Sequence, residues 1–244
     1  DNYYFVKGDK IPYKSNLNMF SYSAGINYKM SNNASIYTRF SNGQKAPDLQ
    51  FYFDNFNSAT ASPAVKAQSI TQFEIGYKFK GAKSSGSIIP FYSKLSNIPV
   101  SSIGQNTDNT AYFTPVVYNT LTTLGLEAEA NLNIVGNFSL IGNATIQSAK
   151  ATTWQSWVMG ANGSADDKLV NNNGNKAENV PTLMLNISPT YSFKKGYLML
   201  TYRYMGAREA NMANVFTLPG FGQLNLSAGY DISSKLSLNA NINN

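Results

Sequence analysis

A strict alternation of apolar and polar residues restricts the fold of this chain more than any other feature of its sequence. Every second residue from Leu124 to Ile134 is apolar, and Glu127, Glu129 and two asparagines occupy positions between them. Successive side chains of a β-strand point to opposite faces, so this segment would have one apolar and one polar face. A helix would distribute the same residues around its circumference. The segment is therefore predicted to be a strand, and residues 224–232 and 236–243 repeat its pattern.

The same criterion, applied along the whole chain, predicts ten strands. They cover residues 19–30, 34–46, 69–80, 86–102, 114–134, 138–153, 179–193, 197–209, 219–232 and 236–244. Pro90 and Pro99 interrupt the fourth segment, because proline cannot donate a hydrogen bond to a neighbouring strand. The run Tyr3-Tyr4-Phe5-Val6 is expected to be the end of an earlier strand or part of a loop.

Short and long connections alternate between these strands. The short ones, at 31–33, 81–85, 135–137, 194–196 and 233–235, are rich in Gly, Asn, Ser and Lys, which favour tight turns. Long polar connections are expected near 47–68, 103–113, 154–178 and 210–218. An antiparallel meander with its tight turns at one end and its loops at the other has this layout. Transmembrane β-barrels are built in this way.

Composition fits such a sheet and excludes several other classes of protein. Charged residues make up only 13% of the 244 residues, about half the usual share of a soluble domain. No apolar run reaches the roughly 18 residues that a transmembrane helix needs. Cysteine and histidine are absent, so thiol chemistry is excluded and the commonest general base and metal ligand are missing. The net charge of +6 is spread along the chain, which fits solvated lysines or attraction to anionic lipids or ligands better than binding of nucleic acid.

Aromatic residues recur close to the tight turns. Those within a few residues of a turn are Tyr28, Tyr77, Phe79, Tyr191, Phe193, Tyr197 and Tyr230. All except Tyr197 also fall on the apolar face of their strand. Aromatic residues at a constant height are typical of the girdle at a membrane interface, so the recurring set favours that role over ordinary strand propensity.

Several segments in order along the chain resemble the C-terminal barrel portion of TonB-dependent outer-membrane receptors. Residues 37–47, Tyr-Thr-Arg-Phe-Ser-Asn-Gly-Gln-Lys-Ala-Pro, are similar to a strand end that precedes an extracellular loop in that family, and 68–77 resemble the strand that follows it. Residues 218–230 and the Asn-rich 236–244 resemble the closing strands. In the family the last segment usually continues into Leu-Phe and another hairpin with an aromatic C-terminal residue, whereas this sequence stops at Asn244.

The resemblance implies an all-β, antiparallel, up-and-down transmembrane barrel of 22 strands with a plugged lumen, of which this chain would supply about ten. Residues 1–244 would then form a partial outer-membrane barrel domain, with the plug domain and the final strands outside this chain. An open sheet leaves backbone groups without partners in lipid, so further strands would have to close it. The partners implied are outer-membrane lipid, a small-molecule nutrient and a TonB-type energy-transducing protein that acts through the N-terminal part. No cofactor is implied.

Six residues are candidates for binding a ligand. Trp154 and Trp157 flank the start of the longest loop, where they would form part of the girdle or a stacking platform for a ligand ring. Tyr52 and Arg208 lie near other strand–loop junctions. Arg39 and Arg203 fall on the polar faces of their strands, where a guanidinium would bind carboxylate, phosphate or catecholate oxygens or pair with an acid of the plug or wall.

Acidic residues offer little catalytic or metal-binding chemistry. Glu127 and Glu129 share the polar face of one strand, and a role in the lumen wall or in docking a plug is favoured over an acid–base pair. Asp166 and Asp167 lie in a loop whose spacing does not match an EF-hand, so a solvated loop is favoured over a calcium site. The chain is therefore predicted not to be an enzyme and to have neither catalytic nor metal-binding residues.

The function expected from these features is energy-coupled uptake of a scarce nutrient across the bacterial outer membrane. The resemblance favours an iron–siderophore complex or a similar metal chelate, with haem, cobalamin or an oligosaccharide as other ligands. Two alternatives remain: a complete small barrel of about ten strands that serves as a passive pore or adhesion scaffold, and a secreted β-sandwich that binds glycans. The membrane alternatives predict exposed apolar stripes on the strands, whereas a sandwich predicts that these stripes are buried.

Overall fold

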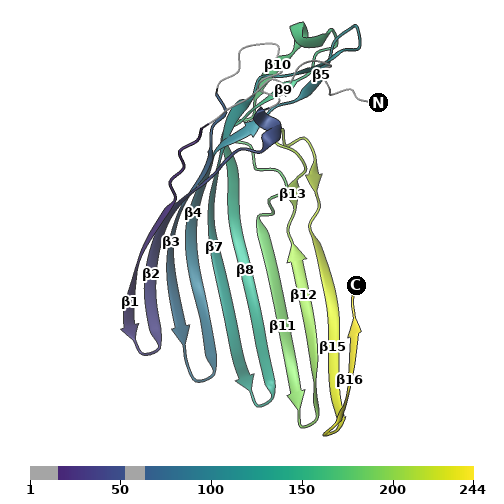
Figure 1. The fold of residues 1–244 in the computed structure, drawn as a ribbon. Coiled ribbons are helices and arrows are strands. Elements are labelled where there is room, and N and C mark those ends of the chain that lie inside the picture. The colour runs from purple at the N-terminus through teal and green to yellow at the C-terminus, as the bar shows by residue number, and fades with distance from the viewer. Residues whose placement is uncertain (1–15, 53–63) are drawn as a thin grey trace.

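One ten-stranded antiparallel sheet dominates the computed structural model, which describes residues 16–52 and 64–244 (Figure 1). Each strand pairs with its neighbours in chain order, so the sheet is a meander. Its strands are β1 (Tyr22–Ser31), β2 (Ala34–Lys45), β3 (Gln68–Lys80), β4 (Ser84–Val100), β7 (Val117–Val135), β8 (Phe138–Thr153), β11 (Leu183–Phe193), β12 (Gly196–Met205), β15 (Phe221–Ser233) and β16 (Leu236–Ile242).

The ten strands predicted from alternation are confirmed, with shifts at their ends. The largest shifts are at β11, which begins at Leu183 rather than 179, and at β12, which ends at Met205 rather than 209. The segment 1–15, which includes Tyr3-Tyr4-Phe5-Val6, and part of the first predicted loop, 53–63, lie outside the described residues. The tight turns all lie at one end of the sheet (Figure 1).

Both prolines of the fourth predicted segment are accommodated within β4. Pro90 pairs with Leu126 of β7 on one side. On the other side, the register between β3 and β4 has no pairs between Glu74–Phe91 and Tyr77–Ile88, which is where the ladder passes Pro90. The missing N–H group of Pro90 therefore affects only one of the two ladders. Pro99 pairs with Tyr118 of β7 and lies beyond the last β3–β4 pair, Ser69–Ser96.

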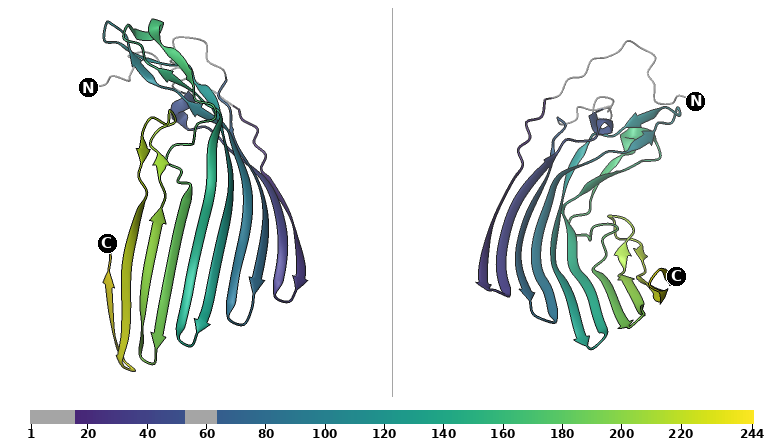
Figure 2. Two further views of the ribbon diagram at one scale, coloured as in Figure 1. Left: turned by 180° about the vertical axis from the view of Figure 1, so that it is seen from behind. Right: turned by 60° about the horizontal axis from the view of Figure 1, so that its bottom comes forward.

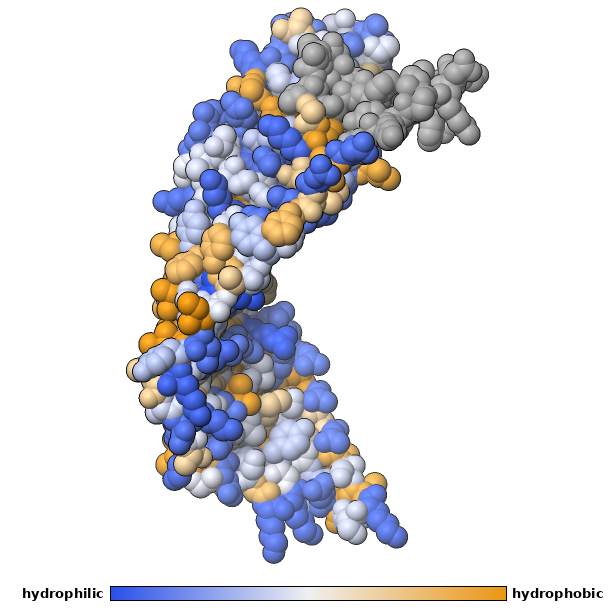
Figure 3. Space-filling view, turned by 60° about the vertical axis from the view of Figure 1, so that its left-hand side comes forward, coloured by the Kyte–Doolittle hydropathy of each residue, from blue (hydrophilic) through white to orange (hydrophobic). Residues whose placement is uncertain are grey.

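The register gives the sheet one apolar face and one polar face. Residues that lie opposite each other on neighbouring antiparallel strands point to the same side. One such row runs through Ala24, Phe40, Phe73, Tyr92 and Leu124. This apolar face is exposed: Leu124 has 64% of its surface accessible. Apolar side chains gather along the convex edge of the molecule at mid-height (Figure 3).

Exposure of the apolar face decides between the two expected kinds of fold. In a β-sandwich these side chains would form the core, but the buried hydrophobic residues are instead found in or next to the loops: Val65, Tyr112, Val116, Ala149, Ala151, Trp154, Ala177 and Met212. On β7 the apolar positions extend from Leu124 to Ile134, about 33 Å along the strand. At a tilt of roughly 40° they form a band about 25 Å high, the height typical of a transmembrane barrel. The sandwich alternative is therefore wrong.

Aromatic rings of the apolar face contact one another near the tight turns. The ring centroids of Tyr77 and Phe79 are 6.2 Å apart, and Phe193 contacts both Tyr191 and Tyr230 at 6.4 Å. Five of the seven predicted girdle residues therefore form two clusters, one on β3 and one across β11 and β15.

The sheet is a curved wall with two open edges (Figure 2). β1 and β16 are its outermost strands, and they do not pair with each other in the described part of the chain. The expectation of about ten strands in an unclosed wall is confirmed, and the alternative of a complete small barrel is not. None of the helical segments in the described ranges has the length and apolarity to span a bilayer.

Candidate ligand-binding site

Three long connections are folded into small hairpins at the end of the sheet opposite the tight turns (Figure 1). The β4–β7 loop contains β5 (Ile103–Gln105) and β6 (Ala111–Phe113). The β8–β11 loop contains β9 (Gln155–Val158), the 3-10 helix η1 (Gly163–Asp166) and β10 (Lys168–Asn171), and the β12–β15 loop contains β13 (Arg208–Glu209) and β14 (Thr217–Leu218). All of these elements except β13 fall in stretches predicted only as polar loops, and β13 falls at the end of the predicted strand 197–209.

The β8–β11 loop lies between the other two and is bound to the β4–β7 loop through side chains. Asn119 is fully buried, and its amide both donates to the carbonyl of Gln155 at 2.9 Å and accepts from the N–H of Gln155 at 2.8 Å. The indole Nε1 of Trp157 donates to the carbonyl of Pro115 at 2.9 Å. These bonds fix the start of β9 against the beginning of β7.

A second contact joins the tips of the same two loops. The hydroxyl of Tyr112 donates to Asp167 Oδ2 at 2.6 Å, and the N–H of Gly160 donates to Oδ1 of the same carboxylate at 3.0 Å. Burial, together with the hydrogen bond to Asp167, raises the pKa of Tyr112 from 10.0 to about 12. Because the pKa is raised in the folded state, this stabilisation is fully present below pH 10 and is lost as the pH rises through about 12. The contact therefore persists throughout the physiological range.

The β12–β15 loop is bound to the other side of the β8–β11 loop. The amide of Asn214 accepts from the N–H of Lys176 at 2.7 Å and donates to its carbonyl at 2.9 Å. Met212 packs with Trp154 and Ala151 in the buried cluster at this end of the sheet. All three loops are consequently held together as one assembly.

The candidate tryptophans differ in exposure. Trp154 is 9% exposed and belongs to the buried cluster, so little of its ring surface can be reached from solvent. Trp157 is partly buried, and its indole nitrogen is engaged by Pro115. Tyr52 lies in the helical residues 49–52 of the β2–β3 loop and is partly buried.

Arg208 is the candidate with an unsatisfied donor. It lies in β13, opposite Leu218, and its Nη1 is buried without a hydrogen-bond partner. The adjacent Glu209 is only 8% exposed, accepts from the hydroxyl of Thr217 at 2.9 Å and lies 3.7 Å from Lys176 Nζ. Glu209 was not among the predicted site residues: the alternation places it at the end of the predicted strand 197–209, and nothing in that pattern shows that its carboxylate is buried.

A groove of about 940 Å³ opens between the β5–β6 hairpin and the segment after β9. Ile103, Gln105, Asn109, Met159 and Ala161 are among the residues that line it. The groove therefore has both apolar surface and amide groups, which suits a ligand of mixed polarity.

The polar face of the sheet contains the remaining candidates. Glu129, Asn143, Asn186, Arg203 and Gln223 form one row across five neighbouring strands. Asn186 Oδ1 in this row is buried and has no hydrogen-bond partner. The side chains of this row can donate and accept hydrogen bonds on the concave side of the wall.

Arg39 and Glu127 lie on the same polar face. Arg39 Nε forms an ion pair with Glu74 Oε1 at 3.0 Å, so this arginine pairs with an acid of the wall itself. Glu127 lies opposite Ile89 on one side and Thr145 on the other. The structure thus groups the candidates into two places, the loop assembly and the polar face.

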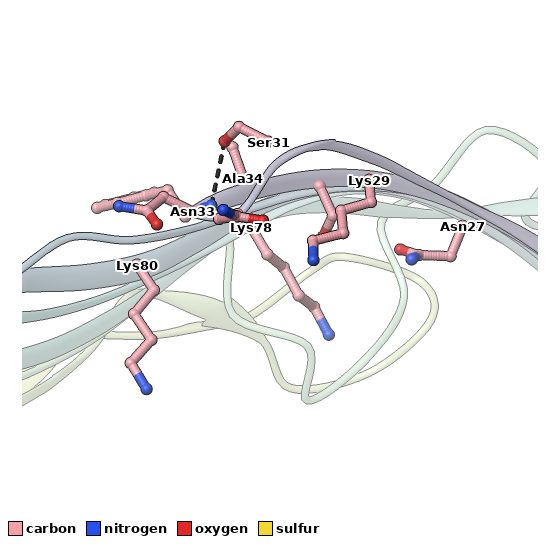
Figure 4. A pocket seen from close by; sticks show the side chains of 10 residues that line it. Asn27, Lys29, Ser31, Asn33, Ala34, Lys78 and Lys80 are labelled. Carbon is pink, nitrogen blue, oxygen red and sulfur yellow. Dashed lines mark hydrogen bonds between the residues drawn. The ribbon is translucent and has the colours of Figure 1, made fainter.

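Lysines gather on the polar face near the tight turns (Figure 4). Lys29, Lys78 and Lys80 line a pocket of about 290 Å³ with Asn27. The ammonium of Lys78 lies 4.8 Å from the centre of the Tyr37 ring, a cation–π contact. The pocket is positively charged at the end of the wall opposite the loop assembly.

The loop with Asp166 and Asp167, for which a calcium site was the less favoured alternative, uses these carboxylates in hydrogen bonds within the protein. Asn162 donates to Asp166, and Asp167 accepts from Tyr112 and Gly160. Within the described residues, no group of three His, Cys, Asp or Glu side chains is placed to hold a metal ion.

An antiparallel meander with an exposed apolar band, a polar concave face, tight turns at one end and folded loops at the other defines the wall of an outer-membrane β-barrel. The chain belongs to the TonB-dependent receptor-like β-barrel family, whose model matches residues 1–244. This is a family of receptors and transporters of the bacterial outer membrane and not of enzymes. No curated protein sequence matches the chain.

Several solved structures have the same fold. The siderophore receptor PiuA from Acinetobacter baumannii is 21% identical with a TM-score of 0.70, and the match covers 91% of this chain and 31% of that one. The ferric-catecholate import receptor Fiu from E. coli K12 is 19% identical with a TM-score of 0.62, over 91% of this chain and 30% of that one. The copper transporter OprC is 15% identical with a TM-score of 0.66, over 92% and 33%. The chain thus spans about a third of the length of these proteins.

Proposed function

We propose that this chain forms part of the barrel wall of an outer-membrane receptor that imports a scarce nutrient with energy from a TonB-type protein. The family match over residues 1–244 is the observation that carries this proposal. An iron–siderophore complex or a similar metal chelate is the proposed ligand, because several structures with the same fold are receptors for such complexes.

The rest of such a receptor would lie outside this chain. In lipid every backbone polar group needs a partner, so the edges of β1 and β16 require further strands to close the barrel. We place a plug domain on the concave side. There the polar row from Glu129 to Gln223, together with Glu127, would form hydrogen bonds with it. The unpartnered Asn186 Oδ1 supports this, because buried polar atoms are normally hydrogen-bonded.

Ligand capture is assigned to the loop assembly. Arg208 has a free buried donor and Trp157 has partly accessible ring surface close to the groove-forming segment at Met159. A guanidinium and an aromatic ring together suit a ligand with oxyanion and ring character. Tyr52 and Trp154 are secondary candidates at the same end, and Arg39 and Arg203 would contact the ligand after it enters the lumen.

The experiment is uptake of radiolabelled ferric chelates by cells that express the full-length receptor containing this chain. A panel of ferric catecholate, ferric hydroxamate, haem and cobalamin would be compared with a strain that lacks the receptor. Uptake of at least one ferric chelate should depend on the receptor and should stop when the proton gradient across the inner membrane is dissipated. Receptor-dependent uptake that continues without the gradient would support a passive pore instead.

Variants of the loop residues test the proposed capture site. Trp157→Ala combined with Arg208→Ala should lower uptake at least about tenfold, which corresponds to ~1.4 kcal/mol. Trp157→Phe keeps an aromatic ring but removes the donor to Pro115, so it separates stacking from loop support. Heat-modifiable migration on a gel should be unchanged in each variant. Wild-type uptake by the double variant would move the capture site to Arg39 and Arg203.

A further inference from the structure

Two lysines interrupt the uncharged character of the apolar face. Among the residues of the ten sheet strands, Lys94 on β4 and Lys150 on β8 are the only charged side chains whose register places them on that face. The other charged strand residues lie on the polar face: Lys29, Arg39, Lys45, Glu74, Lys78, Lys80, Glu127, Glu129, Arg203 and Asp231.

The two lysines belong to one row. Lys94 lies opposite Thr122 of β7, and Thr122 lies opposite Lys150. An isolated bridge then pairs Lys150 with Lys176 of the β8–β11 loop, which extends the row by one more cation. Neighbouring strands are ~4.8 Å apart, so the Cα atoms of the three lysines lie within about 15 Å of one another. All three side chains are exposed.

Acidic groups lie only at the Lys176 end of this row, where Glu178 is two residues along the chain and forms a bridge with Glu209. Lys176 Nζ lies 3.7 Å from Glu209, which is itself shared with Thr217. In the described residues no carboxylate forms an ion pair with Lys94 or Lys150. Like charges on neighbouring strand positions repel, so the row favours an anion from outside the chain.

The position of the row relative to the apolar band indicates which kind of anion it can bind. The row lies two residues closer to the loops than the row of Tyr92 and Leu124, which ends the apolar band. Asn42 and Thr71, joined by a 2.9 Å hydrogen bond, continue the polar row along β2 and β3. A lysine on the lipid-facing side is costly at the middle of the bilayer but costs only ~0–1 kcal/mol near the interface. The lysines therefore lie where the hydrocarbon ends and headgroups begin.

We propose that Lys94, Lys150 and Lys176 form a binding site for the phosphate groups of a glycolipid headgroup in the outer leaflet. The hydroxyls of Thr122 and Thr152, which are 2.6 Å apart, lie beside Lys150 and add hydrogen-bonding groups between the cations. The site faces away from the lumen, so it is separate from ligand capture and rests only on the membrane location proposed above. It would hold one lipid at a fixed position against β4, β7 and β8.

The test measures lipid binding to the purified, delipidated full-length receptor by native mass spectrometry. Diphosphoryl lipid A is the probe, and dephosphorylated lipid A is the control lipid. Lys94→Gln combined with Lys150→Gln should weaken binding of diphosphoryl lipid A at least about tenfold, because each basic residue near a membrane surface contributes appreciably to anion attraction. Lys94→Arg with Lys150→Arg should retain binding.

Lys194→Gln combined with Lys195→Gln is the matched control, since it removes the same charge from a tight turn at the opposite end of the sheet. It should bind diphosphoryl lipid A as the wild type does. Unchanged binding by the Lys94/Lys150 glutamine variant, equal losses in both glutamine variants, or equal binding of both lipids by the wild type would each overturn the site. Heat-modifiable migration checks that every variant forms its barrel, so failure of the site is distinguishable from failure of the membrane location.

Discussion

Two asparagine side chains in and beside the loop assembly form the pair of hydrogen bonds that the backbone of a neighbouring strand would otherwise form. Asn119 and Asn214 each donate to and accept from a single backbone residue, as a neighbouring strand would. Asn119 was predicted to lie in the strand 114–134 and Asn214 in the polar loop 210–218, and neither pattern distinguishes them from solvated asparagines. Their partners, Gln155 and Lys176, are 36 and 38 residues away, and only the folded chain brings them together.

Glycine is paired with an aromatic ring at several places on neighbouring strands. The Tyr37 ring lies over Gly76, and the Phe91 ring lies over Gly125. A side chain at either glycine would occupy the position of the ring. Alternation alone does not reveal this, because glycine fits both faces of a strand.

Gly76→Ala is therefore expected to destabilise the receptor by about 1–3 kcal/mol, the usual cost of overpacking. The added methyl group would overlap the Tyr37 ring and would displace it from Lys78. The measurement is reversible denaturant unfolding in lipid vesicles. Gly142→Ala is the control, since its nearest contact would be 3.4 Å from the backbone oxygen of Asn186, an ordinary distance. Equal stability of the two variants would contradict the steric account.

At the scale of elements, the strands were predictable and the loop hairpins were not. A strand such as β7 has 19 residues, and its period of two is set by the difference between its two faces. β9 and β10 have four residues each and β13 has two, too few to establish a period. Contacts between loops, such as Trp157 with Pro115, decide where these short strands form.

The two faces of β7 should tolerate charge differently. Leu126→Arg is expected to destabilise folding in lipid by roughly 2–4 kcal/mol, because it places a cation within the apolar band. Asn131→Arg lies on the polar face of the same strand and should cost far less. Leu226 and Asn225 offer the same comparison on β15. Equal penalties for the two faces, measured by reversible unfolding in bilayers, would argue against the lipid-facing assignment.

At the scale of the whole molecule, the fold class followed from the alternation and the family from the order of its motifs. An unclosed wall was also expected, and within residues 16–52 and 64–244 the outermost strands β1 and β16 do not pair with each other. The candidate site was predicted less well. Arg39, Arg203, Glu127 and Glu129 lie on the polar face as expected, but Trp154 is largely buried. Burial in the loops depends on contacts between distant segments, and a single sequence does not show these.

The direction of the wall in the membrane can be tested with epitope tags. A tag inserted after Ala161, in the β8–β11 loop, should be reached by antibody on intact cells, because this end is assigned to the outside. Tags at Asn32 or Gly136, in tight turns, should be reached only after the outer membrane is permeabilised. Gly136 suits insertion, since a Cβ atom added at this glycine would have no other atom within 4 Å. Labelling of the tight turns on intact cells would reverse the assigned direction.

The central place of the β8–β11 loop affects how this sequence can diverge. A deletion there would remove the partners of Asn119 and Asn214 together, and with them the hydrogen bonds that join this loop to β7 and to the β12–β15 loop. Changes in the three loops should therefore accumulate as compatible sets during evolution, even though the residues concerned are far apart in the chain. A receptor of this kind would acquire a new ligand by replacing the set of loops, while the wall that carries them stays unchanged.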